Sequence, residues 1–314
     1  MVVVGAALVA ALALQVADVR LAAAQTPTLV ARRAPAVPMA DPWDAVWSRA
    51  SSVQLPLSAQ LVVAPKGGSR DSVRVRAIHD DARLYVLLEW ADVTAERSIS
   101  GATAYADAAA LQFPAASTTA VPPLCMGSPT EIVNIWQWKA AWQEDAASDF
   151  TKIASTYPRA TVDQYPFAAD AEYAPARRLG NLAARADRPS PVENLHAGQY
   201  GTLTTAAAQP VAGTGAWRGG TWRVLLHRDL VVPGEGDVRF AVGEAVDAAV
   251  ALWDGGAAER DGMKAVSAFF TLRLVGTPIS PPQLPLFPWL LIAPLASALL
   301  IGLLMLVGRA QRAA

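Results

Sequence analysis

The chain has 314 residues, 53% of them hydrophobic, a net charge of −1 at pH 7 and a single cysteine, Cys125. The balanced charge excludes a polyanionic partner, so we expect no interaction with nucleic acid. One cysteine cannot form an intrachain disulfide, and there is no CxxCH motif for covalent haem attachment.

An uncharged apolar run begins the chain. Residues 2–17 read VVVGAALVAALALQVA, and three alanines at 22–24 form a small-residue cleavage site. This arrangement predicts a secretory signal peptide over residues 1–24, with Gln25 as the new N-terminus. No Lys or Arg precedes the run, and an N-terminal membrane anchor is the alternative interpretation, although the run is short for a span.

Alternating apolar and polar residues dominate from about residue 40 to 275. The runs SVRVRAIHD and RLYVLLEWAD flank Asp80-Asp81-Ala82, which predicts a hairpin with a tight turn. Similar short runs follow, separated by Gly, Pro and Asp. We therefore predict a mainly β fold, an antiparallel β-sandwich or barrel, over residues 25–276.

The run VNIWQWK at 133–139 ends in one of only four lysines in the chain. On a strand its side chains divide between two faces: Val133, Ile135, Gln137 and Lys139 on one, Asn134, Trp136 and Trp138 on the other. Either face could be the inner one. A buried ammonium costs several kcal/mol unless it is paired or neutralised, and one resolution is a deprotonated amine that binds a metal. Methionine thioether, as in Met126, is another unusual donor and a known haem ligand.

Residues 141–195 differ from the rest. They are rich in Pro, Ala, Tyr and Asp and have weak periodicity. We interpret them as a long insertion with short helices at most. It is either a functional loop or partner surface, or a tolerated surface insertion.

The C-terminal part predicts a membrane anchor. A Pro-rich stalk at 277–284 precedes an uncharged apolar segment, 285–307, which is long enough for a transmembrane helix. Arg309 and Arg312 follow in the tail 308–314 and place it in the cytoplasm. The expected location is the cell membrane, with a single span and the β domain on the extracytoplasmic, periplasmic side.

Other motifs carry little chemistry. The three histidines are far apart in sequence and predict no zinc site. The glycines of GTGAWRGG (213–220) indicate a hairpin loop rather than a phosphate cradle. Cys125 has no activating base nearby in sequence and is interpreted as a small buried residue.

Several segments resemble the ethylbenzene-dehydrogenase-related haem-binding family, the gamma subunits of periplasmic type II molybdenum enzymes of the dimethyl sulfoxide reductase family. The matching pieces are DPWDAVW (41–47), LYVLLEWAD (84–92), YADAAALQFP (105–114), PPLCMG (122–127), VNIWQWKA (133–140), HAGQYGTLT (196–204), WRVLLHRDL (222–230) and ALWDGGAAERDGMKAVSAFFTLRL (251–274). They extend over nearly the whole expected β domain.

The resemblance implies a β-sandwich that holds one non-covalent haem b with Met/Lys axial ligation, which falls here on Met126 and Lys139. The other methionines after the signal peptide are Met39, Met263 and Met305, and the other lysines are Lys66, Lys152 and Lys264. Met263 and Lys264 are adjacent, so on a strand they point to opposite faces and cannot clamp one iron together. Lys152 is the rival for the lysine role.

The resemblance also implies a role without substrate chemistry. The chain would be an electron-transfer subunit whose partners are an iron–sulfur beta subunit, a molybdopterin alpha subunit, and a quinone-linked or c-type cytochrome acceptor or donor. Trp253 to Gly256 (WDGG) would form a turn near the haem edge. Arg223 and Arg228 would either pair with haem propionates or be ordinary solvent-facing arginines.

Two other functions stay open. A membrane-tethered carbohydrate-binding or adhesion module would use exposed tryptophans as a ligand platform, and the chain has ten. A free-standing haem enzyme would need an open coordination position on the iron, which two protein ligands do not leave.

Overall fold

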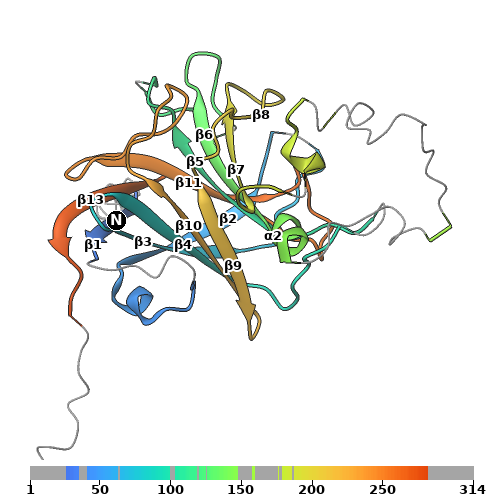
Figure 1. Cartoon of the computed structure of the whole chain (residues 1–314), viewed down its shortest axis with the longest axis horizontal. Helices are drawn as coiled ribbons and strands as arrows, with labels where there is room; N and C mark the ends of the chain where they lie inside the picture. The colour runs from blue at the N-terminus through green and yellow to red at the C-terminus, as the bar shows by residue number, and fades with distance from the viewer. Residues whose placement is uncertain are drawn as a thin grey trace, which may run out of the picture. The chain divides into compact units, whose positions relative to one another are not determined.

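The computed structural model consists mainly of β-strands (Figure 1). It describes residues 26–34, 41–62, 64–99, 103–118, 120–124, 126–147, 158–159, 176, 179–185 and 187–281. The chain divides into two units, residues 1–279 and 280–314. All the described strands and helices belong to the first unit.

The described residues form thirteen strands and three short helices, which turns and loops connect. The strands are β1 (Thr28–Arg33), β2 (Ser52–Ala59), β3 (Ser72–His79), β4 (Arg83–Ala91), β5 (Ala108–Pro114), β6 (Val133–Lys139), β7 (Val192–Ala197), β8 (Thr204–Thr205), β9 (Ala212–Arg218), β10 (Thr221–Asp229), β11 (Ala245–Trp253), β12 (Ala265–Ser267) and β13 (Phe270–Pro278). The helices are η1 (Ala45–Arg49), α2 (Ala140–Ala147) and η3 (Leu182–Ala184).

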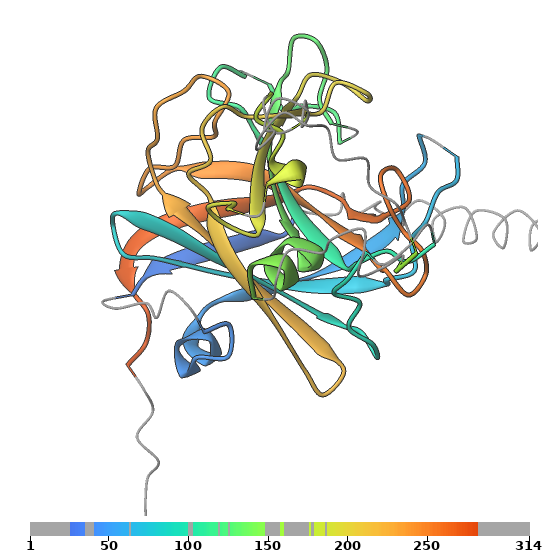
Figure 2. The same cartoon turned by 45° about the vertical axis from the view of Figure 1, so that its right-hand side comes forward.

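The strands pair in a closed circuit with two extensions. The circuit runs β11–β12–β2–β3–β1–β13 and returns to β11. From β11 the strands β5, β6, β7 and β8 extend as one wing, and from β3 the strands β4, β10 and β9 extend as the other. The long β9–β10 hairpin of the second wing, in gold, is visible in Figure 2. The predicted mainly antiparallel β fold is confirmed, except that β1 pairs in parallel with β13 and with β3.

The predicted hairpin between β3 and β4 is also confirmed. The two strands pair from Arg74 opposite Glu89 to His79 opposite Leu84. Asp80 Oδ1 accepts hydrogen bonds from the backbone N–H groups of Ala82 and Arg83. Hydrogen bonds of this kind explain why aspartate is common in tight turns, and they account for the turn that the sequence predicted here.

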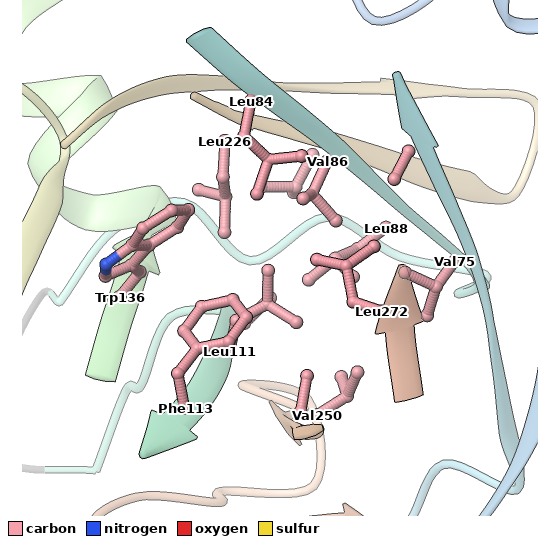
Figure 3. Close-up of a cluster of buried hydrophobic side chains, with 14 of the residues drawn as sticks. Val75, Leu84, Val86, Leu88, Leu111, Phe113, Trp136, Leu226, Val250 and Leu272 are labelled. Carbon is pink, nitrogen blue, oxygen red and sulfur yellow. The ribbon is translucent and has the colours of Figure 1, made fainter. Parts of the chain in front are cut away.

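The main core lies between the two wings. Leu84, Val86 and Leu88 of β4 point toward Leu111 and Phe113 of β5, together with the buried Trp136 and Leu226 (Figure 3). Trp138 of β6 meets Trp222 of β10 edge to face, with ring centroids 5.0 Å apart. Aromatic pairs of this kind contribute about 0.5–1.5 kcal/mol beyond the area that they bury.

The structure corrects one boundary. Residues 192–195, assigned to the insertion from sequence, belong to β7, which pairs along its length with β6. The predicted short helices are present as α2 and η3.

Other predicted segments lie outside the described residues: the signal peptide 1–24, most of the insertion, the helix 285–307 and the tail 308–314. Among the described residues, the structure contains no helix with the length and apolar character to cross a bilayer.

Close packing between the wings gives a first prediction. A Cβ on Gly215 of β9 would overlap the indole of Trp138. We expect Gly215→Ala to lower the free energy of unfolding by about 1–3 kcal/mol through overpacking, measured by urea denaturation. Gly276→Ala is the matched strand control, because a Cβ there meets only Val242 at 3.8 Å. Equal effects of the two substitutions would contradict the packing described.

Candidate functional site

The orientation of β6 decides which face Lys139 occupies. Trp136 and Trp138 are fully buried in the main core, where Trp136 lies 4.9 Å from Phe113 between ring centroids. The alternate residues, ending with Lys139, therefore face away from the core. The inner face that the sequence left undecided is the tryptophan face, so Lys139 does not lie in the main core.

The outer face of this wing has a floor of small side chains. The register places Ala110 of β5 beside Ala251 of β11, and Ala108 beside Trp253. The buried apolar side chains of this face form a cluster of their own, separate from the main core, and Met126 and Ala251 pack against that cluster. Because alanines fill little space above a sheet, the floor leaves room for a flat apolar group.

Two cavities lie on this face. The larger, about 140 Å³, is lined by Lys139, Trp142, Tyr105, Arg260 and Trp253 among others; we call it the Lys139 cavity. The smaller, about 40 Å³, is lined by Met126, Gln112, Ile135, Lys264 and Trp253 among others; we call it the Met126 cavity. Trp253 lines both, so the two cavities adjoin along one side chain.

Met126 is held in an unusual backbone conformation. Its φ is 70°, and Gly127 follows with a φ of 77°. A left-handed conformation costs a non-glycine residue about 1–2 kcal/mol. A Cβ on Gly127 would overlap the carbonyl of Glu131, so the turn requires glycine there. Backbone strain of this kind points to function, and here it brings the Met126 thioether to the cavity.

Lys139 already has partners. Its Nζ forms an ion pair with Glu193 of β7 and lies 4.0 Å from the ring centroid of Trp142. The Lys139 side chain is 25% exposed and that of Glu193 is 9% exposed. Thr205 Oγ1 donates a hydrogen bond of 2.6 Å to Glu193 Oε1. The lysine is therefore accommodated as a charged group without any metal.

Lys264 was discounted from sequence, yet it lines the Met126 cavity. Its Nζ lies 5.1 Å from the ring centroid of Trp253. The adjacency of Met263 and Lys264 excluded only those two as a pair. It did not exclude Lys264 together with Met126, and the structure brings these two to one cavity. Lys152, the other rival, lies outside the described residues, as does Cys125.

A buried amide also lies in the Met126 cavity. Gln112 is only 9% exposed, and its Nε2 has no hydrogen-bond partner among the described residues. Buried polar groups are nearly always satisfied, so this unmatched donor is available to a group that enters the cavity. Sequence reasoning missed this residue, because nothing in AALQFP distinguishes Gln112 from an ordinary strand position.

The two arginines proposed for propionate binding are elsewhere. Arg223 pairs with Glu89 and lies over Trp43, on the other wing. Arg228 is neither solvent-facing nor near the cavities; it is buried in the main core, where its NH2 donates a hydrogen bond to the carbonyl of Val238. Both belong to β10, which is on the far side of the core from the alanine floor.

A buried carboxyl group supports the site from the core side. Asp107, which is 0% exposed, accepts hydrogen bonds from Trp222 Nε1 and from the backbone N–H groups of Gly255 and Glu96. Burial raises the pKa of Asp107 to about 7. It connects β10 to the turn after β11, and residues 255–258 form the turn predicted for WDGG.

The tryptophans do not form an exposed platform. Seven of the ten are buried: Trp47, Trp90, Trp136, Trp138, Trp142, Trp222 and Trp253. Trp43 and Trp217 are partly buried, and Trp289 lies outside the described residues. Within the part of the chain that the structure describes, the surface expected of a carbohydrate-binding module is therefore missing.

The family model and the named relatives agree with one another. The family model described as ethylbenzene dehydrogenase matches residues 44–265. A Haloferax mediterranei protein named as a candidate heme subunit of a respiratory nitrate reductase, ORF7, is 30% identical over 243 residues, covering 77% of this chain and 70% of that protein. The gamma subunit of chlorate reductase from Ideonella dechloratans is 26% identical, covering 73% and 76%.

A third relative and a solved structure also resemble the chain. The gamma subunit of dimethylsulfide dehydrogenase from Rhodovulum sulfidophilum is 27% identical and covers 72% of each chain. Among solved structures, a family 9 carbohydrate-binding module from Caldicellulosiruptor kristjanssonii in complex with glucose has a TM-score of 0.41 and 10% identity, covering 82% of this chain and 99% of that one. A structural likeness this weak carries no functional argument.

The raised pKa of Asp107 predicts a pH-dependent stability. The folded carboxyl group binds its proton more tightly than the unfolded one, so its contribution is full below about pH 4 and is lost as the pH rises through about 7. We expect the free energy of unfolding from urea titrations to contain a component that falls between about pH 4 and pH 7 and is absent from Asp107→Asn.

Other groups also titrate in this range. Burial lowers the pKa of His227, which acts in the opposite direction, and raises the pKa of Asp92, which acts in the same direction. The difference between the wild type and Asp107→Asn separates Asp107 from His227. Asp92 acts electrostatically on Asp107, so Asp92→Asn is compared in the same way. If the two proteins lose stability in parallel, Asp107 is not the group responsible.

Proposed function

Because the chain belongs to the ethylbenzene dehydrogenase family, we propose that it is a haem-binding electron-transfer subunit, of the gamma type, of a molybdenum oxidoreductase complex. It does no substrate chemistry itself. The observation that carries the proposal is the alanine-floored outer face of the β5–β8 wing, with a methionine and two lysines on its two adjoining cavities.

The relatives support the non-catalytic role. Their names refer to a nitrate reductase, a chlorate reductase and a dimethylsulfide dehydrogenase. The first two enzymes reduce their substrates and the third oxidises its own. A subunit common to complexes with such different substrates is best explained by the step that they share, which is the passage of electrons.

The residues present fit a haem by their chemistry. Thioether sulfur and lysine nitrogen are both able to bind haem iron, and the floor is apolar. Typical ligand pockets have volumes of about 300–1,000 Å³, and each of the two cavities is smaller than this. Side chains at the rim must therefore separate when a group as large as haem enters. The unsatisfied amide of Gln112 agrees with a site that is completed by a ligand.

We assign the iron ligands to Met126 and Lys264. These two line one cavity, whereas Lys139 lines the adjoining one and is paired with Glu193. Lys139, the ligand implied by the family resemblance, stays a competing prediction. For either lysine, binding requires the neutral amine, because an ammonium group has no lone pair to donate.

A haem b held without a covalent bond would supply a one-electron carrier at this site. The chain's own residues would then fix its surroundings. Met126 and one lysine would hold the iron, and two protein ligands would keep oxygen and substrates away from it. Trp253 and the alanine floor would exclude water, and such an apolar shell tunes the potential.

The cellular setting is part of the proposal. The apolar segment 285–307, followed by Arg309 and Arg312, favours a single-pass membrane anchor with the β domain on the periplasmic or extracytoplasmic side. The partners would be an iron–sulfur beta subunit and a molybdopterin alpha subunit, with a quinone-linked or c-type cytochrome at the other end of the electron path.

The reduced-minus-oxidised visible spectrum of the full chain with added haem tests the function. We expect a low-spin, six-coordinate b-type spectrum. Met126→Ala and Lys264→Ala should each convert it to a high-spin form, because one axial ligand is lost. Met263→Ala and Lys66→Ala are the matched controls, since neither residue lines a cavity, and both should leave the spectrum unchanged.

Each alternative predicts a different result. A high-spin spectrum in Lys139→Ala but not in Lys264→Ala would restore Lys139 as the ligand. Ready binding of carbon monoxide by the reduced wild type would show an open coordination position and favour a haem enzyme. If the wild type takes up no haem, the electron-transfer function is wrong.

A further inference from the structure

The Lys139 cavity contains two cationic side chains from distant parts of the chain. Lys139 ends β6, and Arg260 follows the turn after β11. Between them the walls are largely aromatic, with Tyr105, Trp142 and Trp253. Two cations in one half-enclosed, aromatic-walled cavity form a setting in which an anion is stabilised more strongly than in water.

Aromatic rings orient both cations. Lys139 Nζ lies 4.0 Å from the ring centroid of Trp142, and Arg260 Cζ lies 4.4 Å from that of Tyr105. Arg260 forms no ion pair among the described residues, and its printed hydrogen bonds go to the carbonyl of Ala258 and, at 3.6 Å, to the sulfur of Met263. Its guanidinium therefore retains N–H donors for a further acceptor.

Three carboxyl groups also line this cavity: Asp107, Glu259 and Asp261. Asp107 is buried and accepts hydrogen bonds from Trp222 Nε1 and from two backbone N–H groups. Glu259 is buried and accepts hydrogen bonds from the backbone N–H groups of Gly68, Ser69 and Asp254. Asp261 also lines the cavity but is exposed, so solvent screens its charge. Glu193 forms an ion pair with Lys139 and accepts a hydrogen bond from Thr205, which does not line the cavity.

The cavities adjoin at Trp253, over Ala108 and Ala110. A flat group with its centre at Met126 and Lys264 would extend over this floor toward Lys139 and Arg260. We propose that Lys139 and Arg260 form a carboxylate subsite, which binds the acidic edge of the haem. This inference rests on the proposed function, and it gives Lys139 a role other than iron ligation.

The test compares haem with its dimethyl ester, in which both propionates are neutral. The full chain, Lys139→Met and Arg260→Met are titrated with each. Each substitution removes a charge-assisted hydrogen bond to a propionate, so affinity for haem should fall at least about tenfold. The affinity of each variant for the ester should change little. The spectra of the variants should stay low-spin with haem and with the ester.

Glu193→Gln is the matched control. It removes a charge beside Lys139 but keeps the lysine, so the preference for haem over its ester should persist. Because Arg260 is exposed, Arg260→Met keeps the test informative even if Lys139→Met folds poorly.

Three results would overturn the subsite. Methionine can itself bind haem iron, so Lys139→Ala rather than Lys139→Met tests ligation, and a high-spin spectrum of Lys139→Ala with both compounds would make Lys139 an iron ligand. Equal weakening for haem and ester would show a merely structural role. Unchanged affinity in both variants would mean that the propionates lie elsewhere. Absence of haem binding by the wild type differs from all three and would reject the proposed function as well.

Discussion

The alternation of side chains along β6 is the constraint on which the rest of the site depends. Trp136 and Trp138 are committed to the core between the wings, where Phe113 and Trp222 meet them. Since the pleat sends alternate residues to opposite faces, Lys139 must lie on the outer face. A shift of one residue would bury the lysine and expose two indoles, so the hydrophobic effect fixes the register.

Ion pairing and aromatic contacts explain how charged lysines persist on an apolar face. From the sequence, Lys139 had two alternatives: a buried, unpaired ammonium group, or a neutral amine bound to a metal. The structure provides a third solution, because Lys139 meets Glu193 and Trp142, and Lys264 lies over Trp253. Half-exposed lysines with such partners pay little for their charge. Ligation of either lysine to iron would then compete with these existing partners.

Local patterns predicted the strands and the β3–β4 hairpin, because alternation and turn residues act over a few positions. The pairing of β1 with β13 could not be predicted this way, since its partners are at opposite ends of the domain. Glu193 was missed because β7 was assigned to the insertion. Lys264 was discounted because it is adjacent to Met263 and points to the opposite face. That adjacency does not prevent Lys264 from sharing a cavity with the distant Met126. The methionine turn was recognisable, since Met126 and Gly127 stand together in sequence, but the unsatisfied Gln112 becomes visible only with a cavity beside it.

The closed circuit of strands has a consequence for biosynthesis. β1 pairs with β3 near its end, but the rest of β1 finds its partner only when Thr271 and the rest of β13 have been made, because Thr28 pairs with Thr271. A nascent chain therefore cannot complete the circuit during translation, and ordering so long a loop slows folding. The circuit therefore stays open until synthesis of the domain is almost finished, and its closure is the step that joins the first strand of the domain to the last.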